Sequence, residues 1–90
     1  MKRLSVTIFG RVQGVGFRYF LRSQARALGL NGWVQNTDQN TVESMVEGSE
    51  TALKEFLKLC HKGPLFARVE NVIPEWETAT KEFSGFEILR

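Results

Sequence analysis

The stretch from Gly10 to Arg18 combines glycines and an arginine at a spacing that suits anion binding. It has the sequence Gly-Arg-Val-Gln-Gly-Val-Gly-Phe-Arg, with glycines at positions 10, 14 and 16. Glycines let the backbone bend tightly and adopt positive φ, so several N–H groups can point at one spot. A helix that begins after Gly16 would add free N–H groups and the positive end of its dipole. We therefore expect a phosphate-sized anion cradle here.

Arg18 is placed in the first turn of the helix that is expected after this loop. The helix dipole disfavours a cation there by about 0.3–1 kcal/mol, and helical side chains lean back toward the N-terminus, here toward the loop. A bound phosphate would reverse the local electrostatics and accept two parallel hydrogen bonds from the guanidinium group. The spacing alone leaves equally open a glycine-rich connection beside a solvent-facing arginine.

Other catalytic motifs do not fit the chain. A P-loop requires Gly, four residues and then Gly-Lys-Ser/Thr, which does not occur, and a dinucleotide fingerprint starting at Gly14 needs Gly or Ala where Tyr19 stands. No Asp or Glu precedes Asp38. Cys60, which we expect to be buried and inert, and His61 lie far along the chain from the loop, so neither a Cys–His pair nor a metal cluster is predicted there. We expect no metal and no cofactor.

The elements expected around the loop follow the order strand, helix, strand, strand, helix, strand. Alternating apolar residues predict a strand over 3–10, and helical spacing predicts a helix from Phe17 to Gly29. The later elements are predicted as strands over 32–36 and from 42, a helix from 49 to 63, a strand over 67–73 ended by Pro74, and a strand over 86–89. This order predicts an α+β, ferredoxin-like split βαβ sandwich: an antiparallel sheet with two helices on one face and a short extra C-terminal strand.

Composition limits the class of protein. The chain has 90 residues, which predicts one domain over residues 1–90. No apolar run approaches the roughly 18 residues of a membrane span, and the start lacks the pattern of a secretory signal, so no membrane partner is expected. The single cysteine excludes an internal disulfide and fits a reducing, cytoplasmic location. We expect a monomer.

Charge is distributed unevenly along the chain. Residues 1–37 carry six basic and no acidic side chains, whereas the remaining 53 residues carry six basic and ten acidic ones. A field of one sign on one part of a small domain attracts anions. Chance, with a solvated basic face, is the alternative interpretation. The net charge of +2 is small for a partner of nucleic acid.

Two segments resemble the motifs of a known family. The run from Gly10 to Arg18 resembles the signature of the acylphosphatase family, and the segment from Gly32 to Thr37 resembles its second motif. The separation of the two also matches, and the likeness extends over nearly the whole chain. The hairpin turn at 38–40 departs from the family, because it lacks a glycine that many members have there. Asn40 tolerates the left-handed conformation that such a turn needs.

The resemblance implies hydrolysis of acyl phosphates to a carboxylate and inorganic phosphate, without a metal. It implies that backbone N–H groups of Val12, Gln13, Gly14 and Val15 bind the phosphoryl oxygens. It further implies that Arg18 binds the phosphate and that Asn36 positions the attacking water. An acyl carboxylate is a weak base, so its departure needs no general acid. The small-molecule partners are therefore an acyl phosphate and inorganic phosphate.

Two other classes of function remain open. Ferredoxin-like sheets can present aromatic residues to single-stranded nucleic acid. The chain lacks the RNP1 pattern, so we expect no nucleic-acid partner. The second class is an anion-binding domain that does not catalyse. Asn36 argues against that class, because pure binding needs the loop and Arg18 but has no need for a water-orienting amide.

Overall fold

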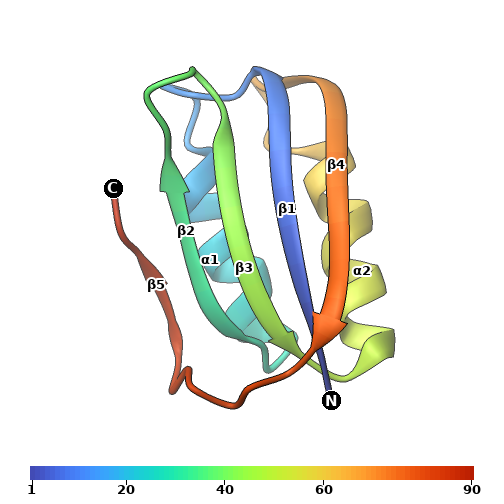
Figure 1. Cartoon of the computed structure of the whole chain (residues 1–90). Helices are drawn as coiled ribbons and strands as arrows, with labels where there is room; N and C mark the ends of the chain where they lie inside the picture. Colours follow the sequence, from blue (N-terminus) through green and yellow to red (C-terminus); the bar gives the residue numbers. More distant parts are fainter.

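Two helices cover one face of a five-stranded sheet in the computed structural model, which describes residues 1–90 (Figure 1). The elements are β1 (Lys2–Arg11), α1 (Phe17–Ala27), β2 (Asn31–Asn36), β3 (Val42–Gly48), α2 (Glu50–Lys62), β4 (Arg68–Thr78) and β5 (Phe86–Ile88). The strand order is β4-β1-β3-β2-β5. The predicted ferredoxin-like α+β fold is confirmed. Its sheet is mixed rather than purely antiparallel, because β5 pairs parallel with β2 while the other neighbours are antiparallel.

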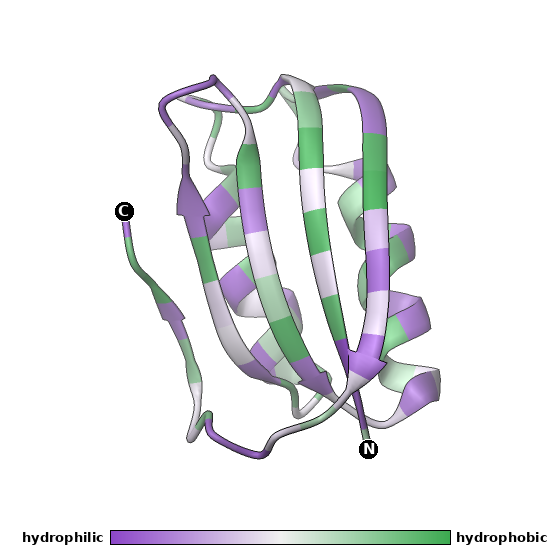
Figure 2. Ribbon diagram, in the orientation of Figure 1, coloured by the Kyte–Doolittle hydropathy of each residue, from purple (hydrophilic) through white to green (hydrophobic).

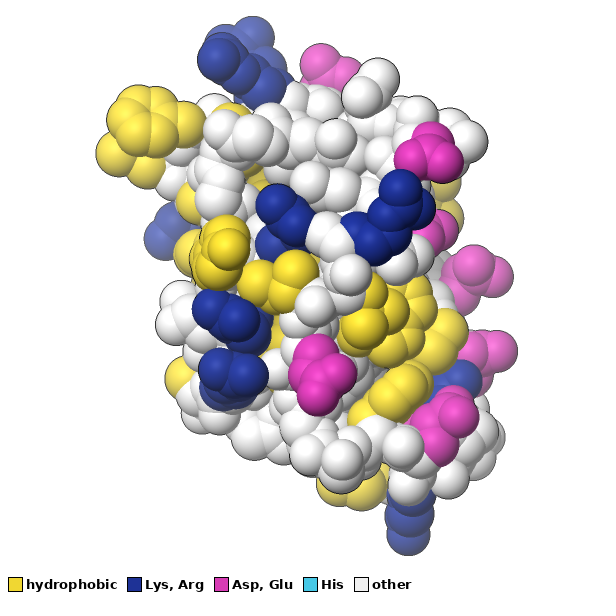
Figure 3. All heavy atoms as spheres, turned by 90° about the vertical axis from the view of Figure 1, so that its left-hand side faces the viewer, with side chains coloured by type: hydrophobic (Ala, Val, Ile, Leu, Met, Phe, Trp, Pro, Cys, Tyr) yellow, Lys and Arg dark blue, Asp and Glu magenta, His cyan; other side chains and the backbone are white.

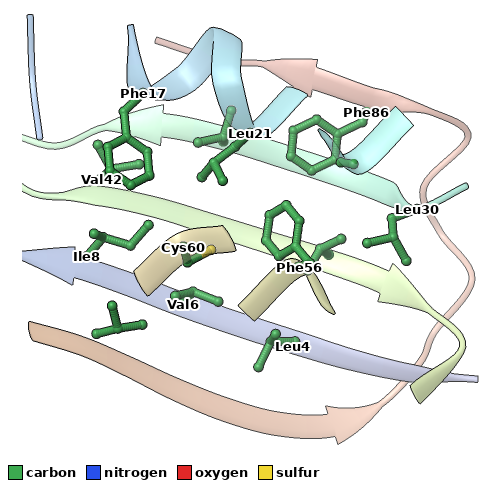
Figure 4. Packing of buried hydrophobic residues seen from close by; sticks show 14 of the residues in the cluster. Leu4, Val6, Ile8, Phe17, Leu21, Leu30, Val42, Phe56, Cys60 and Phe86 are labelled. Atoms are coloured by element: carbon green, nitrogen blue, oxygen red, sulfur yellow. The ribbon is translucent and has the colours of Figure 1, made fainter. Parts of the chain in front are cut away.

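Strand alternation gives the sheet one apolar face and one more polar face. Leu4, Val6 and Ile8 of β1 are buried, and the residues between them are not, which produces the alternating colours of β1 in Figure 2. These three side chains belong to one core cluster with Phe56 and Cys60 of α2 (Figure 4). Burying this apolar surface between sheet and helices is the main favourable contribution to folding. The helices therefore lie on the face that these residues form.

The direction of the strands brings two connections to the same edge of the sheet, which here means the side on which β1 and β2 end and not an outer strand. β3 runs antiparallel to both β1 and β2, so β1 and β2 run in the same direction. Residues 12–16, which follow β1, and residues 37–41, which follow β2, therefore lie at the same edge (Figure 1). Neither α1 nor α2 is long and apolar enough to cross a membrane.

The predicted end of the fourth strand at Pro74 is wrong. β4 continues to Thr78, and Pro74 lies opposite Val6 in the ladder with β1. β4 is one of the two outer strands of the sheet, so a proline can stand where its missing N–H would face outward. Trp76 lies on the same strand and is 40% exposed. The predicted turn at 38–40 is present, and Asn40 adopts φ 62°.

A largely buried ion pair holds the connection between β4 and β5 in place. It lies on the side of the sheet where β1 begins and β3 ends, opposite to the loops described above. Glu47 accepts hydrogen bonds from Arg3 Nε (2.8 Å), the Thr80 N–H (2.8 Å) and the Lys81 N–H (2.9 Å). Burial raises the pKa of Glu47, but the hydrogen bonds from Thr80, Arg3 and Lys81 together outweigh burial and hold this pKa below its ordinary value. The carboxylate therefore holds the segment after β4 against the end of β3.

Candidate active site

The loop between β1 and α1 has the bent backbone that the sequence predicts. Gly14 adopts φ 74° and Gly16 adopts φ 80°, both in the left-handed region that favours glycine. A Cβ at either position would meet no atom within 4 Å, so conformation rather than crowding requires glycine there. The open space also leaves this side of the loop accessible. Residues 12–16 thus form an open, tightly bent loop that leads directly into α1, and we call it the cradle.

The N-terminus of α1 lacks both a side chain that accepts hydrogen bonds from its free N–H groups and an acidic residue that would balance its positive charge. In α2, the Ser49 hydroxyl accepts a hydrogen bond from the Ala52 N–H, and Glu50 occupies the first turn. In α1, Gly16 provides no side-chain cap and the first turn holds no acidic residue. It holds Arg18 instead, which is half-buried. The positive end of the helix dipole and a guanidinium group therefore lie together without a negative partner.

In the folded chain, part of the positive charge of residues 1–37 is neutralised by ion pairs. Lys2 and Arg3 lie at the far edge of the sheet, where they pair with glutamates at 3.4 and 2.8 Å. The basic residues of the first 37 without a carboxylate partner are Arg11, Arg18, Arg22 and Arg26. Viewed from the β5 side, basic side chains predominate over the helices, and acidic side chains gather toward the sheet (Figure 3). Within the first 37 residues, the unpaired positive charge thus lies in and near α1.

Asn36 ends β2 with its side chain on the helix-covered face. It lies opposite Val42 of β3, which itself lies opposite Ile8 of β1, and both of these apolar residues are fully buried. The Asn36 Oδ1 atom is buried and accepts no hydrogen bond. An unsatisfied buried acceptor costs roughly 1–3 kcal/mol, so such atoms are uncommon unless a ligand or water serves them. The site therefore holds a hydrogen-bond acceptor with no donor in the protein.

The backbone of Asn36 is held by the segment after β5, a feature that sequence reasoning missed. The Asn36 N–H donates to Arg90 O at 3.2 Å, and the Leu89 N–H donates to Val34 O at 2.9 Å. The Arg90 guanidinium also pairs with Asp38 at 3.1 Å. The contacts join residues more than 50 positions apart, and no local pattern in the sequence indicates them.

The Gln13 side chain joins the cradle to the turn after β2. Its Nε2 donates to Thr37 O and to Thr41 O, both at 2.9 Å. Sequence reasoning assigned only the backbone N–H of Gln13 to the site. The side-chain contacts cross between two loops, and only the folded structure reveals them. They bring the turn that follows Asn36 against the cradle.

The remaining candidate groups, Cys60 and His61, lie in the last turns of α2, and neither side chain makes a hydrogen bond to the cradle or to Asn36. Cys60 is fully buried, and burial raises the pKa of its thiol, so the predicted inert core role is supported. His61 is exposed in the last turn of α2. No three side chains of His, Cys, Asp or Glu come together in residues 1–90. The largest surface hollow, about 290 Å³, is lined in part by Trp33, Phe83 and Glu87 near β5 and does not include the cradle.

The fold and this edge define a class of small α+β domains with a glycine-rich loop before the first helix and an asparagine at the end of a neighbouring strand. The acylphosphatase family model matches residues 4–88. An acylphosphatase of Salinibacter ruber is 46% identical over 89 residues, 99% of this chain and 94% of the relative. The crystal structure of acylphosphatase from Bacillus subtilis superposes with a TM-score of 0.96 at 36% identity, covering 100% of both chains. An acylphosphatase structure from Coxiella burnetii gives 0.90 at 34% identity, covering 97% of this chain and 90% of that one.

The chain belongs to the acylphosphatase family. It is thereby an enzyme of the acylphosphatase type, and the family supports hydrolysis of acyl phosphates. The resemblance noted from the two sequence motifs is confirmed.

Proposed function

We propose that this single-domain chain hydrolyses acyl phosphates as a cytoplasmic monomer, without a metal, a cofactor or a nucleic-acid partner. The observation that carries the proposal is the partnerless Asn36 Oδ1 at the same edge of the sheet as the uncapped N-terminus of α1. One provides an acceptor for water, and the other provides positive charge for a phosphoryl group. Both are needed for attack of water on phosphorus.

The cradle and Arg18 would bind the phosphoryl group. Backbone N–H groups of Val12, Gln13, Gly14 and Val15 would donate to its oxygens, and the Arg18 guanidinium would donate two parallel hydrogen bonds. Arg18 has no carboxylate partner to displace, which favours its availability for the anion. Catalysis of phosphoryl transfer is mostly positioning and charge stabilisation, and these donors would meet the charge on the equatorial oxygens.

Asn36 would orient the attacking water. Its Oδ1 would accept a hydrogen bond from the water and hold the water oxygen in line with the bond to be broken. The water oxygen forms a bond to phosphorus, and the bond from phosphorus to the acyl oxygen breaks. That electron pair leaves with the carboxylate, a weak base that requires no general acid. An amide is not a base at neutral pH, so the substrate phosphate or solvent takes the proton.

The proposal is tested by substrate class and by a chelator. We expect hydrolysis of benzoyl phosphate and acetyl phosphate at a rate unchanged by EDTA. We expect no measurable hydrolysis of phenyl phosphate, because phosphate monoesters are among the slowest substrates to hydrolyse and their leaving group needs an acid that the site lacks. Loss of activity with EDTA would contradict metal independence. Equal rates on the ester and the anhydrides would contradict the mechanism.

A further inference from the structure

The Gln13 amide is the one side chain of the cradle that bonds to the neighbouring turn. Its Nε2 lies 2.9 Å from Thr37 O and 2.9 Å from Thr41 O. Because both partners are carbonyl oxygens, only the amide nitrogen can face them, and both of its hydrogens are used. No other side-chain hydrogen bond joins residues 12–16 to residues 37–41. The Gln13 amide is therefore the side-chain link between the cradle and the turn after β2.

The turn that accepts these hydrogen bonds is itself held together by internal hydrogen bonds. The Thr37 N–H donates to Thr41 O at 3.0 Å, and the two threonine hydroxyls lie 2.6 Å apart. The Thr37 hydroxyl also accepts from the Gln39 N–H at 3.2 Å and from the Thr41 N–H at 3.3 Å. The turn is thus one hydrogen-bonded unit that begins directly after Asn36. A shift of the Gln13 amide relative to the turn is then a shift of the cradle relative to Asn36.

We propose that Gln13 is a positioning residue that sets the distance between the phosphoryl group in the cradle and the water held by Asn36. The inference rests on the proposed function. A reacting pair must approach to about 3–3.5 Å, and a misplacement of about 1 Å can lower the rate by about 100-fold. The backbone N–H of Gln13 lies in the cradle and its side chain lies on the turn, so one residue spans both parts of the site.

The test separates positioning from binding by replacing the amide with an apolar side chain of similar length. We expect Gln13→Met to lower kcat for benzoyl phosphate by at least about 10-fold, while the inhibition constant of inorganic phosphate changes by less than about threefold. Phosphate binding persists because Arg18 and the bent glycine backbone are unchanged. A fall in phosphate affinity as large as the fall in kcat would overturn the proposal, and so would an unchanged kcat.

Gln35→Met is the matched control. Gln35 directly precedes Asn36, but its amide donates to Glu43 Oε1 at 3.1 Å and makes no bond to the cradle. We expect its kcat and phosphate inhibition constant to stay within about twofold of those of the unchanged chain. A loss as large as that of Gln13→Met would show that any amide near this strand end matters, and would overturn a specific role for Gln13.

A double-mutant cycle tests whether Gln13 acts through Asn36. In the Asn36→Ala background, we expect Gln13→Met to lower kcat by less than about twofold further, because the group that it positions is gone. Fully additive losses would overturn the proposal. Absence of turnover by the unchanged chain would instead overturn the proposed function, so the two failures are distinguishable.

Gln13→Glu keeps the proposal testable if the methionine variant folds poorly. An ionised carboxylate would face two carbonyl oxygens, whereas a protonated carboxyl can donate to one of them. We expect the kcat of Gln13→Glu, relative to the unchanged chain at the same pH, to rise at least about threefold between pH 7 and pH 5. A ratio that stays flat over this range would overturn the proposal.

Discussion

The glycines at 10, 14 and 16, which lie in the cradle or just before it, are needed for two different physical reasons. All three have positive φ, so any other L-residue there is strained. At Gly10, a Cβ would also lie 2.1 Å from Arg68 O of the neighbouring strand β4. At Gly14 and Gly16, a Cβ would meet nothing within 4 Å. Gly10 is therefore required by the packing of the sheet as well as by its conformation, and the other two by conformation alone.

This difference predicts unequal losses of stability. We expect Gly14→Ala to lower the free energy of unfolding by about 1–2 kcal/mol, the cost of one left-handed residue. Gly29→Ala, at φ 71° with equally open surroundings, is the matched control and should cost about as much. Gly10→Ala should cost more than about 3 kcal/mol, because backbone atoms must move. Urea denaturation measures all three, and equal losses at positions 10 and 14 would contradict the packing argument.

The elements could largely be predicted from the sequence because their patterns are local. Alternating apolar residues mark β1, and helical spacing with stops at Gly29 and Gly63 marks both helices. The extent of β4 could not be predicted, since whether a strand tolerates Pro74 depends on its place at the edge of the sheet. The parallel pairing of β5 is equally a property of the whole sheet.

The site could be predicted only in part. The bend of the cradle and the place of Asn36 at a strand end follow from glycine chemistry and apolar alternation near each residue. The contacts of Gln13 with the turn, and of Arg90 with the Asn36 backbone, join distant segments. Likewise, the sequence gives no sign that Arg3 is neutralised by Glu47. The sequence alone therefore overstates the uneven charge, because Lys2 and Arg3 are paired with glutamates in the folded chain.

The proposed site and the Arg3–Glu47 ion pair lie at opposite ends of the sheet. The cradle, Arg18 and Asn36 lie at the edge where β1 and β2 end. The pair of Arg3 and Glu47 lies at the other edge, and the Arg3 guanidinium also bonds to Glu82 and Thr80 there. Removing one partner of a buried pair costs roughly 3 kcal/mol. A change at this pair should therefore affect folding without touching the site.

The lowered pKa of Glu47 predicts a specific loss of stability in acid. Burial raises this pKa, but the hydrogen bonds from Thr80, Arg3 and Lys81 hold it below its ordinary 4.5. The ionised carboxylate therefore contributes stability above pH 4.5, and this contribution is lost as the pH falls through the folded-state pKa. We expect the free energy of unfolding to fall less steeply below pH 4.5 in Glu47→Gln than in the unchanged chain.

The exposed Glu50, which pairs with Lys2 and Lys54, provides the control for this prediction. Glu50→Gln should leave the free energy of unfolding nearly unchanged, because exposed ion pairs contribute little. At neutral pH, Glu47→Gln should retain kcat for benzoyl phosphate within about twofold, since the pair lies far from the cradle. Chemical denaturation at several pH values gives the comparison. Parallel pH profiles for Glu47→Gln and the unchanged chain would refute the role given to Glu47.

The central claim is that Arg18 binds the phosphoryl group and that Asn36 orients the attacking water. The most direct test uses Arg18→Ala and Asn36→Ala. It measures kcat for benzoyl phosphate and the inhibition constant of inorganic phosphate in each variant. We predict that each variant loses at least about 100-fold in rate, as expected when a preorganised group is removed from the transition state. Phosphate affinity should fall in Arg18→Ala and persist in Asn36→Ala. Arg22→Ala, on the same helix, should change either quantity by less than about threefold. Full activity of Asn36→Ala, or unchanged phosphate affinity in Arg18→Ala, would contradict the account.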